Sequence, residues 1–172
     1  MLNSLTLIDL LKITKYNIEV HEHDALFTVQ NSRELRGKIK GAHSKNLFLK
    51  NKKNKFFLLT CEESNKVDLK RISKSLKLGN TSFAKEEYLD QYLKITPGSV
   101  SPFALLNDEG GWVDFYLEQT LHESKFVNFH PLVNTFTITI ETNKFIEFMI
   151  ENDKKIHIFS TAEEKILRTY GT

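Results

Sequence analysis

The sequence has 172 residues, of which 40% are hydrophobic and 27% are charged, and its formal net charge is +2. This length is enough for one domain with a sizeable core and too little for two ordinary domains, so we expect a single domain over residues 1–172. Because the net charge is small, it does not indicate what kind of partner the protein binds. The single cysteine, Cys61, excludes an intramolecular disulfide.

The apolar stretches of the chain indicate a soluble protein. None of them approaches the roughly 20 residues needed to span a bilayer. The N-terminus lacks the basic start of a signal peptide, and Asp9 and Lys12 interrupt its apolar stretch. We therefore expect a cytoplasmic protein with no membrane partner, and the lone cysteine agrees with a reducing compartment.

Apolar spacing near the N-terminus predicts an amphipathic helix over residues 4–16, with Ser4 placed to cap it. The first half of the chain also predicts shorter elements: a strand at 18–20, a helical turn at 31–36 and a helix at 68–76. The clearest unit is a β-hairpin, because two apolar runs, 46–49 and 55–59, flank a polar link. Cys61 follows the second run, where a small buried side chain is expected.

The second half of the chain mixes helices and strands. A helix is expected over 83–93 with Ser82 as its cap, followed by a loop over 95–103. Strands are expected at 104–106, 112–117, 126–129, 135–140 and 155–159, the last of which ends the sheet. A further helix is expected over 141–151. This order predicts an α+β domain with a mixed sheet and helices outside it.

Three polar islands interrupt the apolar pattern: residues 41–46, 97–102 and 128–134. Each places small or polar side chains at a strand end, where a rigid sheet can hold a binding or catalytic site. Each also has an ordinary structural explanation. Pro97-Gly98 can be a simple turn, His130 a surface histidine at a bend, and Lys45 one solvated lysine among many.

Standard catalytic and metal-binding signatures are absent from the sequence. It contains no Gly-x-Ser-x-Gly elbow, no His-Glu-x-x-His helix and no phosphate-binding Gly-x-x-x-x-Gly-Lys loop. His21 and His23 would share one face of a strand, and such a pair can bind zinc. Because neither a cysteine nor a third histidine clusters with them, we expect no metal and no cofactor.

Charge is distributed unevenly along the chain. From Arg36 to Lys55 there are eight basic residues and no acidic one. Such a run attracts phosphate and is a candidate nucleic-acid surface. The alternative is a solvated, lysine-rich hairpin, and charge alone does not decide between the two.

Together, the islands resemble the YbaK-like aminoacyl-tRNA editing domains, which are related to the insertion domain of bacterial prolyl-tRNA synthetase. The similarity is greatest to the prolyl-tRNA deacylases that remove alanine from tRNA for proline. The matching stretches are residues 41–49, 67–70, 97–108 and 129–135. Each motif alone is weak, but the four agree in order and spacing, and the resemblance covers nearly the whole chain.

The resemblance implies a mixed, barrel-like β-sheet flanked by helices and an enzyme that hydrolyses the ester of mischarged tRNA in trans. Such an ester is already activated, so the site must position a water and stabilise an oxyanion rather than supply a strong nucleophile. Lys45 matches the lysine needed for activity, and the backbone N–H groups of Gly98 and Ser99 are the expected oxyanion donors. The expected substrate-binding residues are Asn46, Val100, Ser101, Pro102, His130, Leu132 and Asn134.

The expected partner is the acceptor end of a mischarged tRNA, with phosphate contacts from Lys50, Lys52 and Lys53. A prolyl-tRNA synthetase is a further candidate partner. The sequence departs from the family pattern at Ser44, where Thr is commoner, at Lys40, where Pro is frequent, and over the last twenty residues. These departures leave open an editing enzyme for cysteine or serine. A non-catalytic tRNA- or synthetase-binding module of the same fold is the alternative from a different class.

Overall fold

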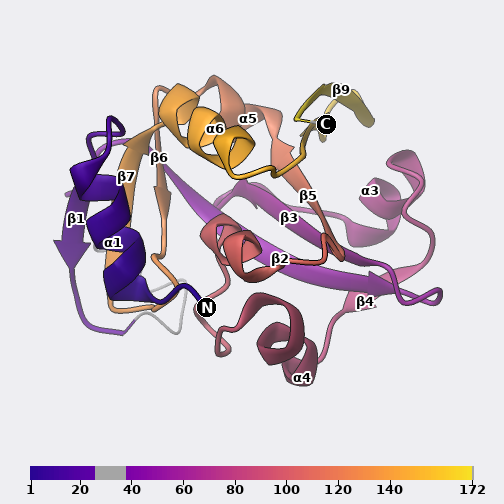
Figure 1. The fold of residues 1–172 in the computed structure, drawn as a ribbon. Coiled ribbons are helices and arrows are strands. Elements are labelled where there is room, and N and C mark those ends of the chain that lie inside the picture. Colours follow the sequence, from indigo (N-terminus) through magenta and orange to yellow (C-terminus); the bar gives the residue numbers. More distant parts are fainter. Residues whose placement is uncertain (26–37, 172) are drawn as a thin grey trace.

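The structure, a computed structural model, describes residues 1–25 and 38–171. Figure 1 shows a curved sheet with helices against it, as the sequence predicted. The helices are α1 Ser4–Ile13, α3 Leu69–Ser75, α4 Glu86–Tyr88, the π-helical turn η1 Leu89–Leu93, the 3₁₀ helix η2 Pro102–Asn107, α5 Gln119–Glu123 and α6 Thr142–Glu151. The strands are β1 Glu19–Glu22, β2 Ala42–Asn51, β3 Phe56–Glu62, β4 Thr81–Phe83, β5 Val113–Glu118, β6 Phe126–Phe129, β7 Phe136–Glu141, β8 Ile156–Ser160 and β9 Lys165–Tyr170.

Within the described residues the strands form one mixed sheet in the order β1-β7-β6-β2-β3-β5-β8-β9, with β4 paired to β2. The expected hairpin is confirmed, because β2 pairs antiparallel with β3 along one edge. The other edge of β2 has two partners. Its start pairs in parallel with β6, and its end pairs antiparallel with β4. Residues 44–47 lie between these two partners and pair with neither, so the sheet opens at the middle of β2.

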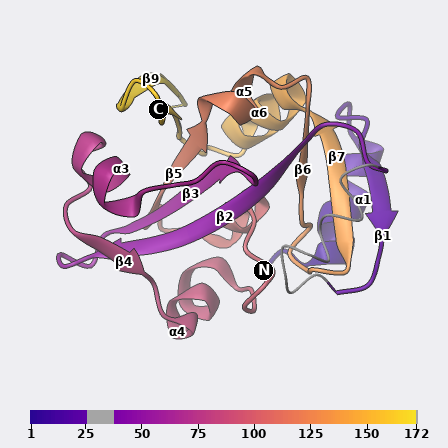
Figure 2. The same ribbon diagram turned by 180° about the vertical axis from the view of Figure 1, so that it is seen from behind.

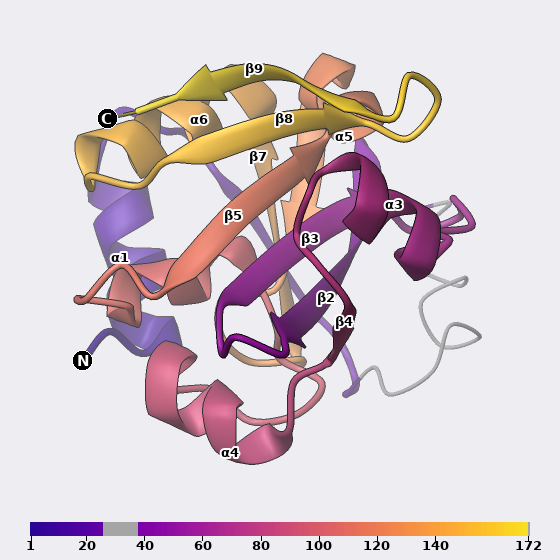
Figure 3. The ribbon, with the colours of Figure 1, turned by 90° about the vertical axis from the view of Figure 1, so that its right-hand side faces the viewer.

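The core lies on both faces of the sheet because side chains alternate along β2 and β3. Phe48, Phe56 and Leu58 belong to the larger cluster, which α1 and α6 complete. Leu49, Phe57, Leu59 and Cys61 face the other way, under α3. Figure 3 shows α3 in front of β3, with α1 and α6 behind the sheet. Cys61 is fully buried as predicted, and burial raises the pKa of its thiol.

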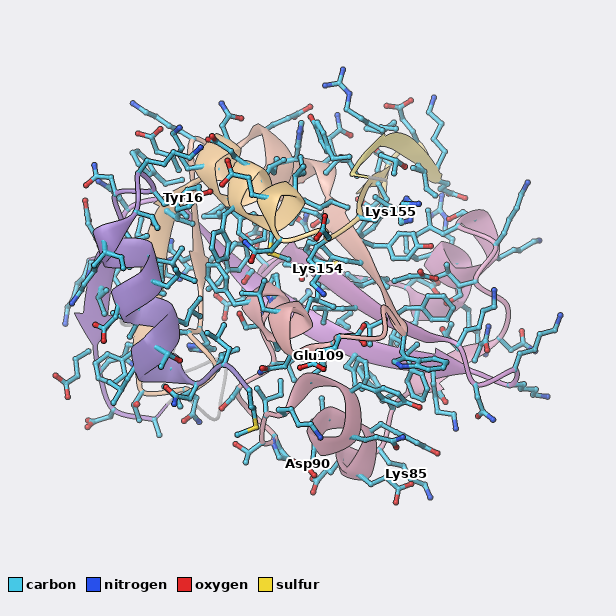
Figure 4. The ribbon with its side chains drawn as sticks, in the orientation of Figure 1. Tyr16, Lys85, Asp90, Glu109, Lys154 and Lys155 are labelled. Atoms are coloured by element: carbon cyan, nitrogen blue, oxygen red, sulfur yellow. The ribbon has the colours of Figure 1, made fainter. Side chains whose placement is uncertain are left out.

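The N-terminal helix is anchored to α6 through the residue that follows it. The ring of Tyr16, labelled in Figure 4, packs edge-on against Phe148, with 5.1 Å between ring centroids. The hydroxyl of Tyr16 donates to Glu151. α1 ends at Ile13 rather than at residue 16. Its cap is Asn3, whose side chain accepts from the Thr6 N–H, so the assignment of Ser4 as the cap was wrong.

Two other expectations at this end have different outcomes. The strand expected at 18–20 occupies Glu19–Glu22, where it pairs with β7. The helical turn expected at 31–36 lies outside the described residues. Farther along, α3 confirms the helix expected at 68–76, and Asp68 caps it through its side chain.

The segment after β4 corrects two predictions. Residues 104–106 were expected as a strand but belong to η2, because Ser101 caps it and Pro102 at its first position presets a helical φ. The helix expected over 83–93 is only the short α4 followed by η1. Ser82 does not cap it, because this residue is extended within β4 and pairs with Lys50.

The C-terminal half otherwise follows the expected order, with β5, β6, β7, α6 and β8 near their predicted places. The prediction that β8 ends the sheet was wrong, because β9 pairs antiparallel with it. β9 is almost entirely exposed, so it lacks the apolar alternation that marks a strand in a sequence. The short α5 was not predicted either. In the described part of the chain, no helix has the length and hydropathy needed to cross a membrane.

Candidate functional site

The three polar islands of the sequence converge at the open middle of β2. Figure 2 shows β2 crossing the molecule between β6, near its start, and β4, near its end. Asn46 joins the first island to the second, because its side-chain N–H donates to the carbonyl of Val100 at 2.9 Å. Ser44 joins the first island to the third through a 3.0 Å hydrogen bond from its hydroxyl to the carbonyl of Asn128.

Asn46 is itself held in a single orientation. The Thr60 hydroxyl, on β3, donates to its side-chain oxygen at 2.7 Å. Because this oxygen accepts, the side-chain nitrogen must be the atom that meets Val100. The loop of residues 97–101 is therefore fixed against the sheet by a residue next to Lys45.

The glycine of this loop sits in a tight turn. The Ser99 N–H donates to the carbonyl of Thr96 at 3.2 Å, and Gly98 has a φ of +85°. Pro followed by a glycine with positive φ is the pattern of a type II turn. The turn occupies the N–H of Ser99, one of the two expected oxyanion donors. Gly98 is exposed, and within the described residues its N–H has no hydrogen-bond partner.

The residues that follow Gly98 anchor the turn to the core. Ser99, Ser101 and Pro102 are buried, whereas Val100 is half-buried. The Ser101 hydroxyl accepts from the Phe103 N–H at 3.3 Å and caps η2. In this structure Ser101 and Pro102 therefore hold the loop in place from within the core.

Lys45 lies on the opposite face of β2 from Asn46, as consecutive strand residues must. Its ammonium donates to the carbonyl of Glu63 at 3.2 Å and to the carbonyl of Asn65, both in the turn after β3. A lysine ammonium carries three N–H donors, so two carbonyls leave one for a ligand. The structure thus holds Lys45 beside the β3–α3 turn, without a hydrogen bond to the glycine loop.

His130 follows β6 and has a defined tautomer. Its Nδ1 lies 2.9 Å from the carbonyl of Phe136, which can only accept, so Nδ1 carries the proton and Nε2 bears a lone pair. Burial lowers the pKa of His130, with smaller lowering contributions from His23 and His43. The Phe136 carbonyl and the charge of Glu63 oppose that shift. Near pH 7 the imidazole is therefore neutral.

Two further residues of the third island have different environments. Leu132 is buried in the larger core cluster and has a φ of +67°, which few side chains other than glycine adopt. Asn134 is half-buried in the turn before β7. Leu132 therefore shapes the site through backbone geometry and packing.

Sequence reasoning missed two buried polar residues that hold the site together. Glu118, fully buried at the end of β5, accepts from the Glu62 N–H at 2.7 Å and from the Asn65 side chain at 3.0 Å. It thereby fixes the turn whose carbonyls hold Lys45. Asn128 donates to the carbonyl of Lys40 at 2.9 Å and anchors β6 beside β2. Glu118 closes an apolar run in the sequence, a weak signal that an exposed strand end would also give.

The lysines expected to contact the tRNA lie at the other end of β2. Lys52 and Lys53 are exposed in the hairpin turn, which Asn51 fixes by accepting from the N–H groups of Lys53 and Lys55. Lys50 is half-buried, with its ammonium 4.8 Å from the centroid of the Tyr88 ring. At about 3.3 Å per residue, the hairpin turn lies on the order of 20 Å along β2 from Lys45.

His21 and His23 each contact a threonine of β7. Nε2 of His21 lies 3.1 Å from the Thr139 hydroxyl, and Nε2 of His23 lies 2.9 Å from the Thr137 hydroxyl. Over residues 1–25 and 38–171, no three His, Cys, Asp or Glu side chains are grouped so that they could hold a metal ion.

Comparison with known proteins gives a consistent result. A family model described as an aminoacyl-tRNA editing domain matches residues 23–148, which include every residue of this site. The chain is 38% identical over 136 residues to the prolyl-tRNA synthetase associated domain-containing protein 1 of Bos taurus, covering 76% of this chain and 79% of that protein. It is 34% identical over 127 residues to the prolyl-tRNA editing protein ProX of Acetoanaerobium sticklandii, covering 73% and 77%.

A solved structure described provisionally as a trans-editing enzyme for prolyl tRNA synthetase has the same fold. It superposes with a TM-score of 0.66 at 16% identity, covering 91% of this chain and 96% of that one. The family match ends before β8 and β9, so the end of the sheet that the sequence did not predict also lies outside the matched region.

Proposed function

This chain belongs to the aminoacyl-tRNA editing domain family, and we propose that within this family it removes alanine from tRNA for proline in trans. The reaction class follows from the family: the chain is an aminoacyl-tRNA hydrolase that acts on mischarged tRNA. The preference for alanine is supported by the similarity to prolyl-tRNA editing proteins. The observation that carries the proposal is that Asn46 ties the glycine loop to β2 through Val100, and Ser44 ties the segment before His130 to β2 through Asn128.

The reaction breaks the ester bond between the amino acid and a ribose hydroxyl. A water oxygen attacks the ester carbonyl, the resulting tetrahedral oxyanion collapses, and the ribose oxygen leaves and takes up a proton. The exposed N–H of Gly98 is the oxyanion donor that the turn leaves available. The neighbouring ribose hydroxyl helps to direct the water, so no protein nucleophile is needed.

Two side chains would hold the substrate. The remaining donor of Lys45 binds the terminal phosphate or the ester carbonyl as a point charge. The lone pair on Nε2 of His130 accepts a hydrogen bond from the ammonium group of the amino acid, because the imidazole is neutral. Release of free alanine from alanyl-tRNA for proline tests the proposal.

The hairpin lysines would bind the acceptor stem. The variant Lys52→Glu/Lys53→Glu should raise the apparent KM roughly tenfold at low salt and change kcat less, because phosphate contacts supply salt-dependent affinity. Steady-state kinetics at several salt concentrations measure both constants. The matched control is Lys12→Glu/Lys155→Glu, which changes the charge equally at exposed positions elsewhere (Lys155 in Figure 4). Equal KM values for the hairpin variant and the parent would mean that the hairpin faces solvent.

Glu118 is expected to act as a positioning residue for Lys45. In the variant Glu118→Gln an amide N–H would face the donors of Glu62 or Asn65, so the turn would shift and carry the two carbonyls that hold Lys45 with it. We expect the free energy of unfolding to fall by about 2 kcal/mol. We also expect kcat/KM to fall about tenfold, because the displaced ammonium no longer meets the terminal phosphate or the ester carbonyl.

Urea unfolding and steady-state kinetics measure these two effects separately. Glu123→Gln is the matched control, because Glu123 is exposed and accepts one hydrogen bond from Gln119. A destabilised Glu118→Gln variant with unchanged kcat/KM, assayed at a temperature where it is fully folded, would show that Glu118 serves stability alone.

A further inference from the structure

A basic groove lies between α3 and the start of β4. Its cavity volume is about 660 Å³, and its lining includes Lys70, Lys74, Lys77, Ser73, Asn80 and Thr81. Among the residues that the structure describes, the lining contains no carboxylate and no large apolar side chain. Ammonium groups together with hydroxyl and amide donors form the kind of surface that binds phosphate oxygens.

The spacing of α3 explains why these lysines gather on one side. Ile72 and Leu76 are buried against the sheet, and Lys70, Lys74 and Lys77 are exposed. Within the described residues none of the three lysines forms an ion pair, whereas the neighbouring Arg71 pairs with Glu164. The hydroxyls of Ser73 and Thr81 are hydrogen-bonded at 2.5 Å. This bond fixes α3 to β4, so the two elements that line the groove are held together.

The elements that line the groove contact the end of β2, where the basic hairpin begins. The Asn51 side chain, which fixes the hairpin turn, donates to the carbonyl of Leu78 at the end of the α3 segment at 2.8 Å. β4 pairs with the last residues of β2 (Figure 3). Phe83, on the same face of β4 as Thr81, is 62% exposed and offers an aromatic face to a base.

We propose that this lysine groove binds the phosphodiester backbone of the tRNA substrate and forms one basic track with the hairpin lysines. The proposal rests on the proposed function, because it takes the bound polyanion to be the tRNA. The track lies on the order of 20 Å along β2 from Lys45. A tRNA with its aminoacyl end at Gly98 therefore places another part of its backbone in the groove.

Binding of uncharged tRNA for proline, followed by fluorescence anisotropy over a range of salt concentrations, tests this surface without any hydrolysis. The variant Lys70→Glu/Lys74→Glu should weaken binding about tenfold or more at low salt. It should also reduce the slope of log affinity against log salt by about two, because two phosphate contacts are lost. Both side chains are exposed, and circular dichroism with thermal unfolding confirms that the variant is folded.

The control variant Lys12→Glu/Lys155→Glu should keep the parent affinity and salt slope. Hydrolysis of a short aminoacylated 3′-end analogue should be equal in the groove variant and the parent, since that substrate does not reach the groove. An unchanged affinity and slope for tRNA in the groove variant would overturn the proposal, as would groove-dependent binding to anionic vesicles without an effect on tRNA. An inactive parent that still binds tRNA through the groove would overturn the proposed function alone.

Discussion

Replacing Lys45 by alanine is expected to lower kcat/KM for deacylation by at least 100-fold, because removal of one preorganised donor at a reacting centre costs roughly 10²–10³ in rate. The structure explains why Lys45 is suited to this role. Two backbone carbonyls hold its ammonium at the β3–α3 turn, and the buried Glu118 fixes this turn. Within the described residues the ammonium forms no ion pair, so its third N–H donor is left for the substrate.

The stability of the Lys45→Ala variant should change little. Lys45 is half-buried, and loss of its two hydrogen bonds to backbone carbonyls should lower the free energy of unfolding by about 1 kcal/mol. Lys155→Ala removes an equal charge from an exposed position and should retain parent activity. A folded Lys45→Ala variant that turns over alanyl-tRNA at the parent rate would refute the role assigned to Lys45.

Hydrolysis of alanyl-tRNA for proline should be at least 100-fold faster in kcat/KM than hydrolysis of the correctly charged prolyl-tRNA. A synthetase site shaped for proline excludes the smaller alanine by only about 1–3 kcal/mol per missing methylene, and a second site can reverse this sieve. The second site must then be lined by rigidly held residues that exclude the larger proline ring. His130 is held by the Phe136 carbonyl, Val100 is held by Asn46, and Pro102 is buried, so each proposed wall is fixed.

Parallel assays with alanyl-, prolyl-, cysteinyl- and seryl-tRNA measure this selectivity. The variant His130→Ala, which widens the site, should raise the relative rate on prolyl-tRNA about tenfold or more, because a lost steric barrier of about 1.4 kcal/mol is a factor of ten. Similar parent rates on alanyl- and prolyl-tRNA would contradict a size filter. Preference for a cysteinyl or seryl ester would keep the reaction and replace the substrate.

Local patterns in the sequence were sufficient for much of the fold. The hairpin of β2 and β3 follows from two apolar runs that flank a polar link, and the position of α6 follows from apolar side chains at helical spacing. Residues 104–106 were misassigned because a short, fully buried apolar run has no periodicity to read. Their 3₁₀ conformation depends on Ser101 and Pro102 just before them.

The site was predictable only in part, because its connections join residues distant in the chain. The polar islands marked Asn46, Gly98 and His130, and hydrogen bonds from Asn46 and Ser44 connect the three islands. That Lys45 faces the β3–α3 turn, opposite Asn46, follows from strand geometry once β2 is placed. The role of Glu118 could not be predicted, since its partners Glu62, Asn65 and Thr161 are distant from it in the sequence.

Release of labelled alanine from alanyl-tRNA for proline by catalytic amounts of the protein tests the central claim most directly. The assay follows free alanine and intact tRNA over time, with Lys45→Ala and a protein-free sample in parallel. We expect many turnovers per protein molecule, alanine and tRNA released in equal amounts, and little release in either comparison sample. Tight tRNA binding with alanine release no faster than in buffer would contradict the account and identify the chain as a non-catalytic tRNA-binding module.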